Sequence, residues 1–536
     1  MLPLLGELTP VVSTSAKLGY PLLTFLVFLP AIGALVAMLV PAGRPDLSRT
    51  VGYVTSVATF GMALFLLTQF DTNPLKPGYQ LLEDHSWIGA LGVRWTLGVD
   101  GISLFMVALS ALLFPIALLA SAKVAKPKSF TIWMLLLESA MIGVFLALDA
   151  IVFFMFFEFV LVPMYFLIAG WGHDNRRYAA MKFFLFTAAG SAFLFAGILA
   201  IAFMHQHSTH VLTFDVRTLT DWAAANVHGG TAKVLFLAFA VGFAVKVPLF
   251  PFHTWLPDAH TDAPTAGSVV LAGVMLKIGA YGFLRFAIPF FPQAAVDLAP
   301  LLLVLAVIGI TYGAIVAAMQ PNLKRIVAYS SVAHLGFVVL GVFAFTNQGI
   351  SGGLFTMLSH GLTTGALFLL VGMLYDRRHT YELSDFRGIW KVAPVFGGLF
   401  VAATFASIGL PGFSGFVGEF LSLLGAFLSS RWYAVVAATG VILAAVYLLW
   451  AVQRAFTGEP DDANRSTPDI GVREMVTVLP LLGLSLFLGF YPKPVLDRLQ
   501  PSVQELVQHV EQNSNYKAPA VPANGPVTAP AQGAGK

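Results

Sequence analysis

The stretch VLFLAFAVGFAVKVPLFPF, residues 234–252, places Lys246 and two prolines inside a run of apolar side chains. Three further runs carry an ionisable residue in the same way: Glu158 in IVFFMFFEFVLVPMYFLIAG, Lys277 in SVVLAGVMLKIGAYGFLRF and Glu419 in GLPGFSGFVGEFLSLLGAF. A charge at bilayer depth costs roughly 2.5 to 3.5 kcal/mol on insertion scales, so intramembrane charges are typical of ion pathways. We therefore interpret these four residues as candidates for moving ions.

The composition indicates a membrane protein. Of 536 residues, 57% are hydrophobic and only 11% are charged, which leaves too little polar surface for a soluble domain. The absence of cysteine excludes thiolate-bound zinc, Cys-ligated iron–sulfur clusters and disulfides. The net charge of +3 is too small to indicate a surface that binds nucleic acid. The sequence also has no phosphate-binding motif and no Ser-His-Asp motif.

Apolar stretches of about 20 residues predict roughly fourteen transmembrane helices. They begin near residues 20, 50, 101, 129, 150, 180, 233, 266, 299, 325, 352, 392, 432 and 472. The N-terminus has no short apolar core followed by a small-residue cleavage site, so the first span is expected to be retained. The fold class is predicted to be all-α and polytopic.

Lysine and arginine are spread unevenly over the connections between these spans. Most stand on odd-numbered connections: Arg44, Arg49, Lys123, Lys126, Lys128, Arg176, Arg177, Lys182, Lys324, Arg325, Arg377, Arg378, Arg387, Lys391, Arg454, Arg465 and Arg473. Fewer stand on even-numbered ones: Lys76, Arg94, Arg217, Lys233, Arg285 and Arg431. Because cytoplasmic loops carry the excess of basic residues, the pattern predicts that both termini lie outside the cytoplasm.

Two spans contain helix breakers at matched positions. In the seventh span, Pro248 and Pro251 follow Lys246, and each proline removes a backbone donor. In the twelfth span, the stretch 409–412, Gly-Leu-Pro-Gly, lies about two turns before Glu419. Broken spans five apart predict two five-helix repeats, and because five is odd the second repeat must be inverted. The alternative is a pair of packing kinks with no transport role.

The predicted organisation places the repeats between flanking segments. The parts are flanking spans one to three (1–128), the first repeat of spans four to eight (129–291), the inverted repeat of spans nine to thirteen (299–453), span fourteen (472–492), and an amphipathic helix with a disordered tail (493–536). The amphipathic helix is expected from Pro501 onward and should lie on the outer surface. The connections at 71–100 and 204–232 are expected to be ordered external loops.

The buried charges suggest a proton switch. Burial lowers the pKa of a lysine and a nearby carboxylate raises it again, so a Lys–Glu pair can hold or release a proton as it closes or opens. Glu158 and Lys246 are the candidate pair, and a static ion pair that fixes helix packing is the alternative. His334 and His360, each flanked by Ser or Thr, could relay protons between Lys277 and Glu419 or could be hydrogen-bonded core residues.

Four polar residues follow the seventh span in PFHTWLPDAHTDAP: His253, Asp258, His260 and Asp262. They have the composition of a metal site, but polar residues are expected at the mouth of a cavity beside a broken helix. We predict no metal site in this chain.

Several motifs resemble the antiporter-like subunit M family of respiratory complex I, the bacterial NADH-quinone oxidoreductase. They are FFEFVLVPMYFLIAGWG, VKVPLFPFHTWLPDAHTDAPTAGSVVLAGVMLKIGAYGFLRF, YSSVAHLGF and GLPGFSGFVGEF, and the likeness covers most of residues 90–490. An acid at Glu419 favours subunit M, because subunits L and N and the large antiporter subunits generally carry lysine there. One departure is Phe157, where the family commonly has tryptophan.

The resemblance implies roles for the same residues. Glu158, Lys246, Lys277 and Glu419 correspond to the charged residues of the family's spans five, seven, eight and twelve, and His334 and His360 match histidines on its central polar axis. It also implies a chain without a redox centre in the bacterial plasma membrane, with FMN, iron–sulfur clusters and quinone in partner subunits. Subunits L and N are the implied neighbours.

We therefore expect a proton-translocating subunit of this enzyme, coupled to quinone reduction elsewhere in the complex. Two alternatives stay open at this point. One is a subunit of a multi-subunit sodium/proton antiporter, which would be driven by an ion gradient. The other is an inert scaffold of the membrane arm.

Overall fold

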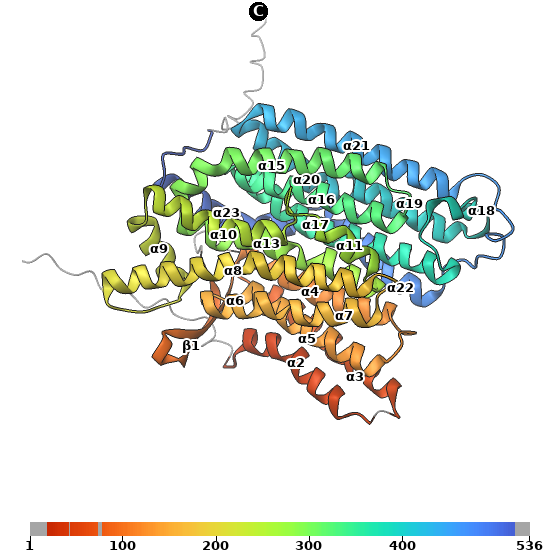
Figure 1. Ribbon diagram of the computed structural model, residues 1–536, viewed down its shortest axis with the longest axis horizontal. Helices are drawn as coiled ribbons and strands as arrows, with labels where there is room; N and C mark the ends of the chain where they lie inside the picture. Colours follow the sequence, from red (N-terminus) through yellow and green to blue (C-terminus); the bar gives the residue numbers. More distant parts are fainter. Residues whose placement is uncertain (1–18, 42, 73–77, 520–536) are drawn as a thin grey trace, which may run out of the picture.

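The computed structural model describes residues 19–41, 43–72 and 78–519. Long helices lie side by side, with the β hairpin at one end of the bundle and α18 at the other (Figure 1). In the described chain, thirteen helices are long and apolar enough to cross a membrane. They are α2 (Leu22–Leu39), α3 (Pro45–Gln69), α4 (Gly101–Ala120), α5 (Pro127–Leu146), α6 with α7 (Ala150–Phe159, Leu161–Trp171), α8 (Arg176–Thr209), α10 (Gly229–Lys246), the run from α12 (Thr265–Val270) to α14 (Ile288–Phe290), α15 (Pro292–Ala318), α16 (Leu323–Phe343), α17 (Asn347–Arg378), α21 (Arg431–Phe456) and α22 (Val472–Phe490).

Shorter elements complete the bundle. They are β1 (Gln80–Ile88), β2 (Val93–Val99), α9 (Val216–Asn226), α11 (Trp255–Asp262), α18 (Ile389–Val392), α19 (Pro394–Ile408), α20 (Ser414–Ser429), α23 (Lys493–Gln512) and the 3-10 turns η1 (Gly89–Leu91) and η4 (Leu383–Asp385). Neither α19 nor α20 is long enough to span a bilayer, but the two in series supply the fourteenth crossing. The predicted all-helical membrane fold with about fourteen spans is confirmed.

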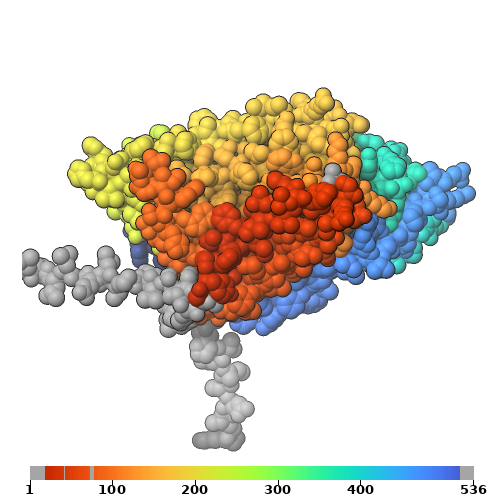
Figure 2. Space-filling model, turned by 90° about the horizontal axis from the view of Figure 1, so that it is seen from below, coloured from red at the N-terminus to blue at the C-terminus, as the bar shows by residue number. Residues whose placement is uncertain are grey.

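The bundle has a wholly buried centre and an apolar exterior. The run α12–α14 and α17 are buried along their apolar windows, and α16 nearly so. The outer helices expose large apolar side chains such as Leu39, Ile442 and Phe490, which a lipid or protein neighbour would cover. Figure 2 shows α2 and α3 forming one side of the molecule. Charges at the centre are therefore far from solvent.

The connection at 71–100 contains an antiparallel hairpin, β1–β2, where the sequence predicts an ordered external loop. Its Glu83 is buried and accepts hydrogen bonds from the backbone N–H groups of Leu23 (2.7 Å) and Thr24 (3.0 Å). The first turn of α2 has no side-chain cap of its own, so this carboxylate satisfies the free donors there. We call the end of the bundle that carries the hairpin and α9 the hairpin face, and the end that carries α18 the opposite face.

The break predicted in the seventh span is present. Helix α10 ends at Lys246, irregular backbone follows over 247–254, and α11 starts at Trp255. Two carbonyls freed by the break find other donors: Ala244 accepts from the N–H of Leu249 (2.9 Å), and Val245 accepts from the indole N–H of Trp255 (2.9 Å). These bonds satisfy backbone groups that prolines would otherwise leave unpaired.

The twelfth span is broken where the Gly-Leu-Pro-Gly stretch predicted it. Helix α19 ends at Ile408, and α20 begins at Ser414. Gly409 (φ +81°) and Gly412 (φ +103°) adopt left-handed conformations that side chains with a Cβ rarely take. The matched breaks agree with two repeats, but the repeat boundaries and the inversion stay predictions.

The amphipathic C-terminal helix is longer than expected, because α23 begins at Lys493 and includes Pro501. Its apolar side chains, among them Val503, Leu506 and Val510, are buried against the bundle, where α23 contacts α4 and α17. The helix lies at the hairpin face, and its apolar side chains pack against the rest of the protein. The tail predicted to be disordered falls, from residue 520 onward, outside the described residues.

Candidate functional site

Lys246 and Glu158 face each other across α10 and α6 without touching. Lys246 is 1% exposed, and its ammonium lies 4.5 Å from the centre of the Phe157 ring and donates to the Phe157 carbonyl oxygen at 3.4 Å. Glu158 Oε1 is buried and has no hydrogen-bond partner in the described part of the chain. The two charges are near enough to interact electrostatically. The candidate pair is therefore open in this conformation, which argues against a permanently closed ion pair.

Lys277 stands at the buried centre, where α13 (Lys277–Gly282) follows the π-helical turn η2 (Leu271–Met275). A π turn shifts the backbone pairing by one residue and leaves a carbonyl free, and such turns are frequent at functional sites. The ammonium of Lys277 donates to the Ala272 carbonyl in this turn. Its other partner is Nδ1 of His360 on α17, at 2.7 Å. Lys277 thus contacts one of the two histidines that the sequence offers as proton relays, and the relay role stays a prediction.

The row continues from His360 to the broken twelfth span. The rings of His360 and His334 lie 5.8 Å apart between centroids. His334 Nδ1 is 2.6 Å from Glu419 Oε1 on α20, and the carboxylate rests against Gly409 at the break. Tertiary packing of α13, α17, α16 and α20 thus brings four residues from separate spans into one row, Lys277, His360, His334 and Glu419.

No hydrogen bond joins Lys246 to Lys277 within the described residues, so the candidate axis has two parts. The helices that carry these two parts, α13 and α10, pack closely against each other. A Cβ on Gly279 would lie 2.5 Å from the Phe243 carbonyl oxygen and 2.5 Å from the Val247 nitrogen. Only glycine lets the backbone of α13 approach the end of α10 so closely. This contact fixes how closely the helix that carries Lys277 packs against the end of the helix that carries Lys246.

The residues around 253–262 lie at the opposite face, where a pocket of about 520 Å³ is lined by Asp258 and Asp262 among others. This agrees with the expected cavity mouth. Asp258 pairs with Lys182 at 2.6 Å. His260 lies deeper, stacks on Phe368 at 4.7 Å between ring centres, and has both ring nitrogens unpartnered in the described chain. Among described residues no three His, Cys, Asp or Glu side chains converge as metal ligands.

Three ionisable residues that are buried within the candidate membrane spans were missed in the sequence. Lys324 and Arg285 were assigned to connections, but both are buried within helical spans. Lys324 donates to the Ala263 carbonyl oxygen at 2.6 Å and lies 5.0 Å from the centre of the Tyr381 ring, beside the pocket of the opposite face. Each stands within a few residues of a span end, so hydropathy alone could not place it.

The third missed residue is Glu138, which is fully buried on α5 and accepts from Ser56 at 3.0 Å. It stands within the apolar run IWMLLLESAMIGVF, so the criterion that selected Glu158 also selects it. It contacts α3 and is not part of the row from Lys277 to Glu419.

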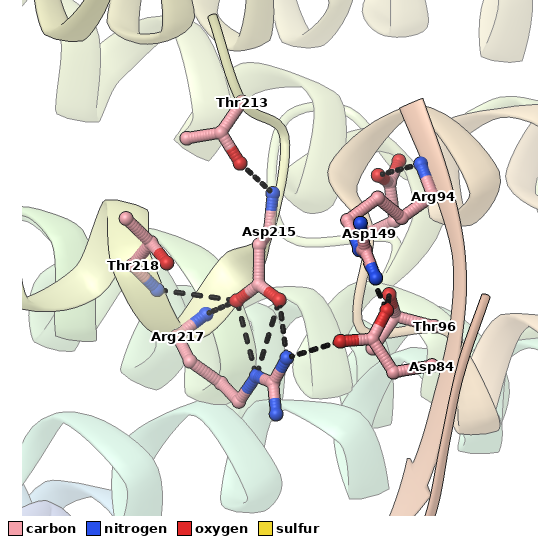
Figure 3. A network of polar contacts seen from close by, with 8 residues as sticks. All are labelled: Asp84, Arg94, Thr96, Asp149, Thr213, Asp215, Arg217 and Thr218. Carbon is pink, nitrogen blue, oxygen red and sulfur yellow. Dashed lines mark hydrogen bonds and ion pairs between the residues drawn. The ribbon is translucent and has the colours of Figure 1, made fainter. Parts of the chain in front are cut away.

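A polar network at the hairpin face fixes the start of the helix that carries Glu158 (Figure 3). Asp149 stands in the turn before α6 and accepts from the N–H groups of Ile151 (2.9 Å), Val152 (3.1 Å) and Arg94 (2.9 Å). Burial raises the pKa of Asp149 to about 6, although these three donors oppose the rise. The hairpin is thereby tied to α6.

The same network links the hairpin to α9. Arg217 donates to Asp215 at 2.5 Å and reaches Asp84 at 3.4 Å, and Asp84 also accepts from Arg94 at 2.7 Å (Figure 3). The charges of Arg94 and Arg217, together with the hydrogen bonds from Arg94 and Thr96, lower the pKa of Asp84 against the opposing effect of burial. These contacts hold the long connections predicted as ordered loops.

Comparison with known proteins identifies the family of this chain. A family model described as NADH:quinone oxidoreductase/Mrp antiporter, TM, matches residues 147–444. The NADH-quinone oxidoreductase subunit M of Rhodobacter capsulatus is 43% identical over 517 residues, which cover 94% of this chain and 99% of that protein. The chain belongs to the NADH-quinone oxidoreductase subunit M family. Its counterpart from Mycobacterium tuberculosis is 38% identical over 94% of this chain and 98% of its own length.

Solved structures agree with this family. A chain of respiratory complex I from Thermus thermophilus with bound NADH is 32% identical with a TM-score of 0.82, and the match covers 91% of this chain and 99% of that one. A chain of the Mrp complex from Dietzia sp. DQ12-45-1b has a TM-score of 0.79 at 21% identity, with 92% of this chain and 100% of that one covered, which is a likeness of fold alone. The resemblance to the subunit M family is confirmed, while the roles of single residues stay predictions.

Proposed function

We propose that this chain is a proton-translocating membrane subunit of NADH-quinone oxidoreductase and that protons move along Glu158, Lys246, Lys277, His360, His334 and Glu419. The observation that carries the proposal is the buried row from Lys277 to Glu419, with contacts of 2.7 Å and 2.6 Å at its two ends. Such a row costs free energy of desolvation and is not needed for packing, since apolar side chains of similar volume stabilise as well.

The groups in the row can exchange a proton along its length. The Lys277 ammonium can give a proton to Nδ1 of His360, because a neutral imidazole accepts on one nitrogen and donates from the other. The second ring, His334, is hydrogen-bonded to the Glu419 carboxylate, which can take up the proton. Each step joins groups on different helices, so small helix movements would control the transfer.

At the other end, Glu158 acts as the switch for Lys246. When the carboxylate approaches the ammonium, the charged lysine is stabilised and holds its proton. When the two are apart, as in this structure, the buried lysine is free to pass the proton toward Lys277. Packing of Gly279 against the end of α10 holds the helices of the two lysines in contact.

The proposal extends to orientation and partners. The basic connections gather at the opposite face, which we assign to the cytoplasm, so that the hairpin face and both termini are outside it. The membrane is the bacterial plasma membrane. The exposed apolar flanks would contact lipid and the neighbouring antiporter-like subunits L and N. FMN, iron–sulfur clusters and quinone belong to partner subunits, and this chain has no redox site.

The test is proton pumping in sealed vesicles that contain the assembled complex. Lys246→Ala and Glu158→Ala should each strongly reduce NADH-driven acidification of the vesicle interior, with quinone reduction measured in parallel. Normal acidification in an assembled variant complex would leave only the scaffold role. Acidification driven by a sodium gradient without NADH would favour an antiporter.

A further inference from the structure

A second pocket lies at the hairpin face, away from the candidate axis. Its volume is about 350 Å³, and its lining includes Tyr79, Asp100, Arg217, Arg285 and Glu505. Partial burial and then the charge of Asp100 raise the pKa of Glu505 on α23. The pocket is lined by both charged and apolar side chains and reaches inward as far as Arg285.

Arg285 stands between this pocket and Lys277 on one continuous run of helix. It is in the π-helical turn η3 (Phe283–Ala287), and Tyr281 lies one turn from each of the two basic residues. At 1.5 Å per residue, Arg285 is roughly 12 Å from Lys277 along the helix axis. The side chain between them, Tyr281, donates to the Phe145 carbonyl oxygen at 3.0 Å and accepts from Nε of Arg285 at 3.1 Å.

The guanidinium of Arg285 is held on every side. It donates to Asp100 Oδ1 at 2.6 Å and to the Tyr79 hydroxyl at 2.8 Å, and its carbon lies 4.9 Å and 5.2 Å from the ring centres of Tyr79 and Tyr281. Both members of the ion pair are about 6% exposed. Asp100 is further fixed as the N-cap of α4, where it accepts from the Ser103 N–H at 3.0 Å. The charge cannot move away in this arrangement.

An immobile guanidinium is suited to stop protons. It keeps its charge at any pH a protein meets, so it cannot carry a proton onward, and it repels a proton that approaches. Fixed arginines exclude protons in selective membrane pores by the same electrostatic effect. The alternative is a structural clamp that joins α4, the hairpin and the helix of Lys277, for which apolar side chains would serve as well.

We propose that the Arg285–Asp100 pair, clamped between Tyr79 and Tyr281, is a proton barrier that closes the Lys277 end of the axis against the pocket at the hairpin face. The inference rests on the proposed function, because it assumes that Lys277 lies on a proton path. It assigns a residue that prevents back-leak, and it predicts that this residue is not required for forward transfer itself.

The test measures passive proton flux, without NADH, in liposomes that contain the complete complex. A potassium diffusion potential set by valinomycin drives the flux. Arg285→Gln should raise the flux several-fold over the parent, and Arg285→Lys, which keeps a charge, should stay close to the parent. The matched control is Arg377→Gln, which removes a bidentate ion pair with Glu474 (2.9 Å and 2.7 Å) at the opposite face.

A double variant links the leak to the axis. Adding Lys277→Met to Arg285→Gln should return the flux to the parent level, because the leak would run through Lys277. If Arg285→Gln does not assemble, Arg285→Gln with Asp100→Asn removes both charges together, and asparagine can still cap α4. The barrier proposal is overturned if an assembled complex is no leakier than the Arg377→Gln control. This holds for the complex with Arg285→Gln and for the complex with Arg285→Gln and Asp100→Asn.

The two proposals fail in different experiments. Passive flux without turnover tests the barrier, whereas NADH-driven pumping in Lys246 and Glu158 variants tests the function. A tight Arg285→Gln complex with pumping lost in the Lys246 variant would refute the barrier alone. Unchanged pumping in the Lys246 and Glu158 variants would refute the function, whatever the Arg285 variants do.

Discussion

The close approach of α13 to α10 gives the sharpest structural prediction, the effect of Gly279→Ala. The added Cβ would be 2.5 Å from two backbone atoms, whereas ordinary contact begins near 3.4 Å, so the helices must separate by about 0.9 Å. Backbone atoms cannot turn aside as a flexible side chain can. Overpacking of this kind typically costs about 1–3 kcal/mol. The separation also moves Lys277 away from Lys246.

We expect Gly279→Ala to lower both stability and pumping. Stability is followed by heating the purified complex and measuring the loss of assembled subunit, and pumping by acidification of sealed vesicles with NADH. The control is Gly309→Ala on α15, where a Cβ meets no atom within 4 Å. The control should be neutral or slightly more stable, because alanine favours helix over glycine by about 1 kcal/mol. If both variants behave alike, the close contact does not position the lysines.

Three further predictions concern single carboxylates. Glu419→Gln should slow proton transfer through this chain by about 10²-fold, which is the usual effect of losing a positioned acid–base group. The amide can keep the contact with His334 but cannot take up a proton. Acidification of the vesicles measures the rate, and Glu419→Asp should keep part of the activity. Asp149 has its pKa raised from 3.8 to about 6, so its ionisation opposes folding: the stabilisation is complete below pH 3.8 and about 3 kcal/mol is lost as pH rises through 6. In thermal unfolding, the advantage of Asp149→Asn over the parent should therefore grow between about pH 4 and pH 6.5 and stay constant above that range. Glu83→Ala should lower stability by about 2 kcal/mol, because the buried N–H of Leu23 loses a charged partner at 2.7 Å.

Each of these predictions has an outcome that would contradict it. Full pumping by an assembled Glu419→Gln complex would remove the carboxylate from the path. A stability difference between Asp149→Asn and the parent that is constant with pH would mean that Asp149 does not titrate in this range. An unchanged melting temperature for Glu83→Ala would show that α2 begins without help from the hairpin.

The sequence predicted the membrane fold well, because hydropathy reports burial in lipid directly. The number of spans and both helix breaks followed from apolar length and from proline and glycine positions, and Pro248 and Gly409 lie where the helices end. The β1–β2 hairpin was not predicted, because its strand pairing depends on contacts between distant segments. The π turns beside Lys277 were missed for a similar reason, since their backbone pairing is set by packing.

For the candidate site, residue type and apolar surroundings were enough to select Glu158, Lys246, Lys277 and Glu419. The same criterion should have included Glu138, which was overlooked. Lys324 and Arg285 could not be separated from ordinary loop charges, because a residue near a span end can turn to solvent or inward. Which way it turns is decided by neighbours such as Asp100 and Tyr79, which are far away in the sequence.

The amino-acid order by itself determined that the chain must lie in a membrane, where its helices break and that Lys246, Lys277 and Glu419 stand in apolar surroundings, since these depend on local composition and on backbone chemistry. Only the tertiary structure decided that Lys277, His360, His334 and Glu419 form one row, that Glu158 stands apart from Lys246, and that Arg285 is locked to Asp100. The physical reason is the distance along the chain over which each effect acts. Hydropathy and helix breaking act within a few residues, whereas hydrogen bonds between helices join residues up to 401 positions apart and exist only after packing is complete.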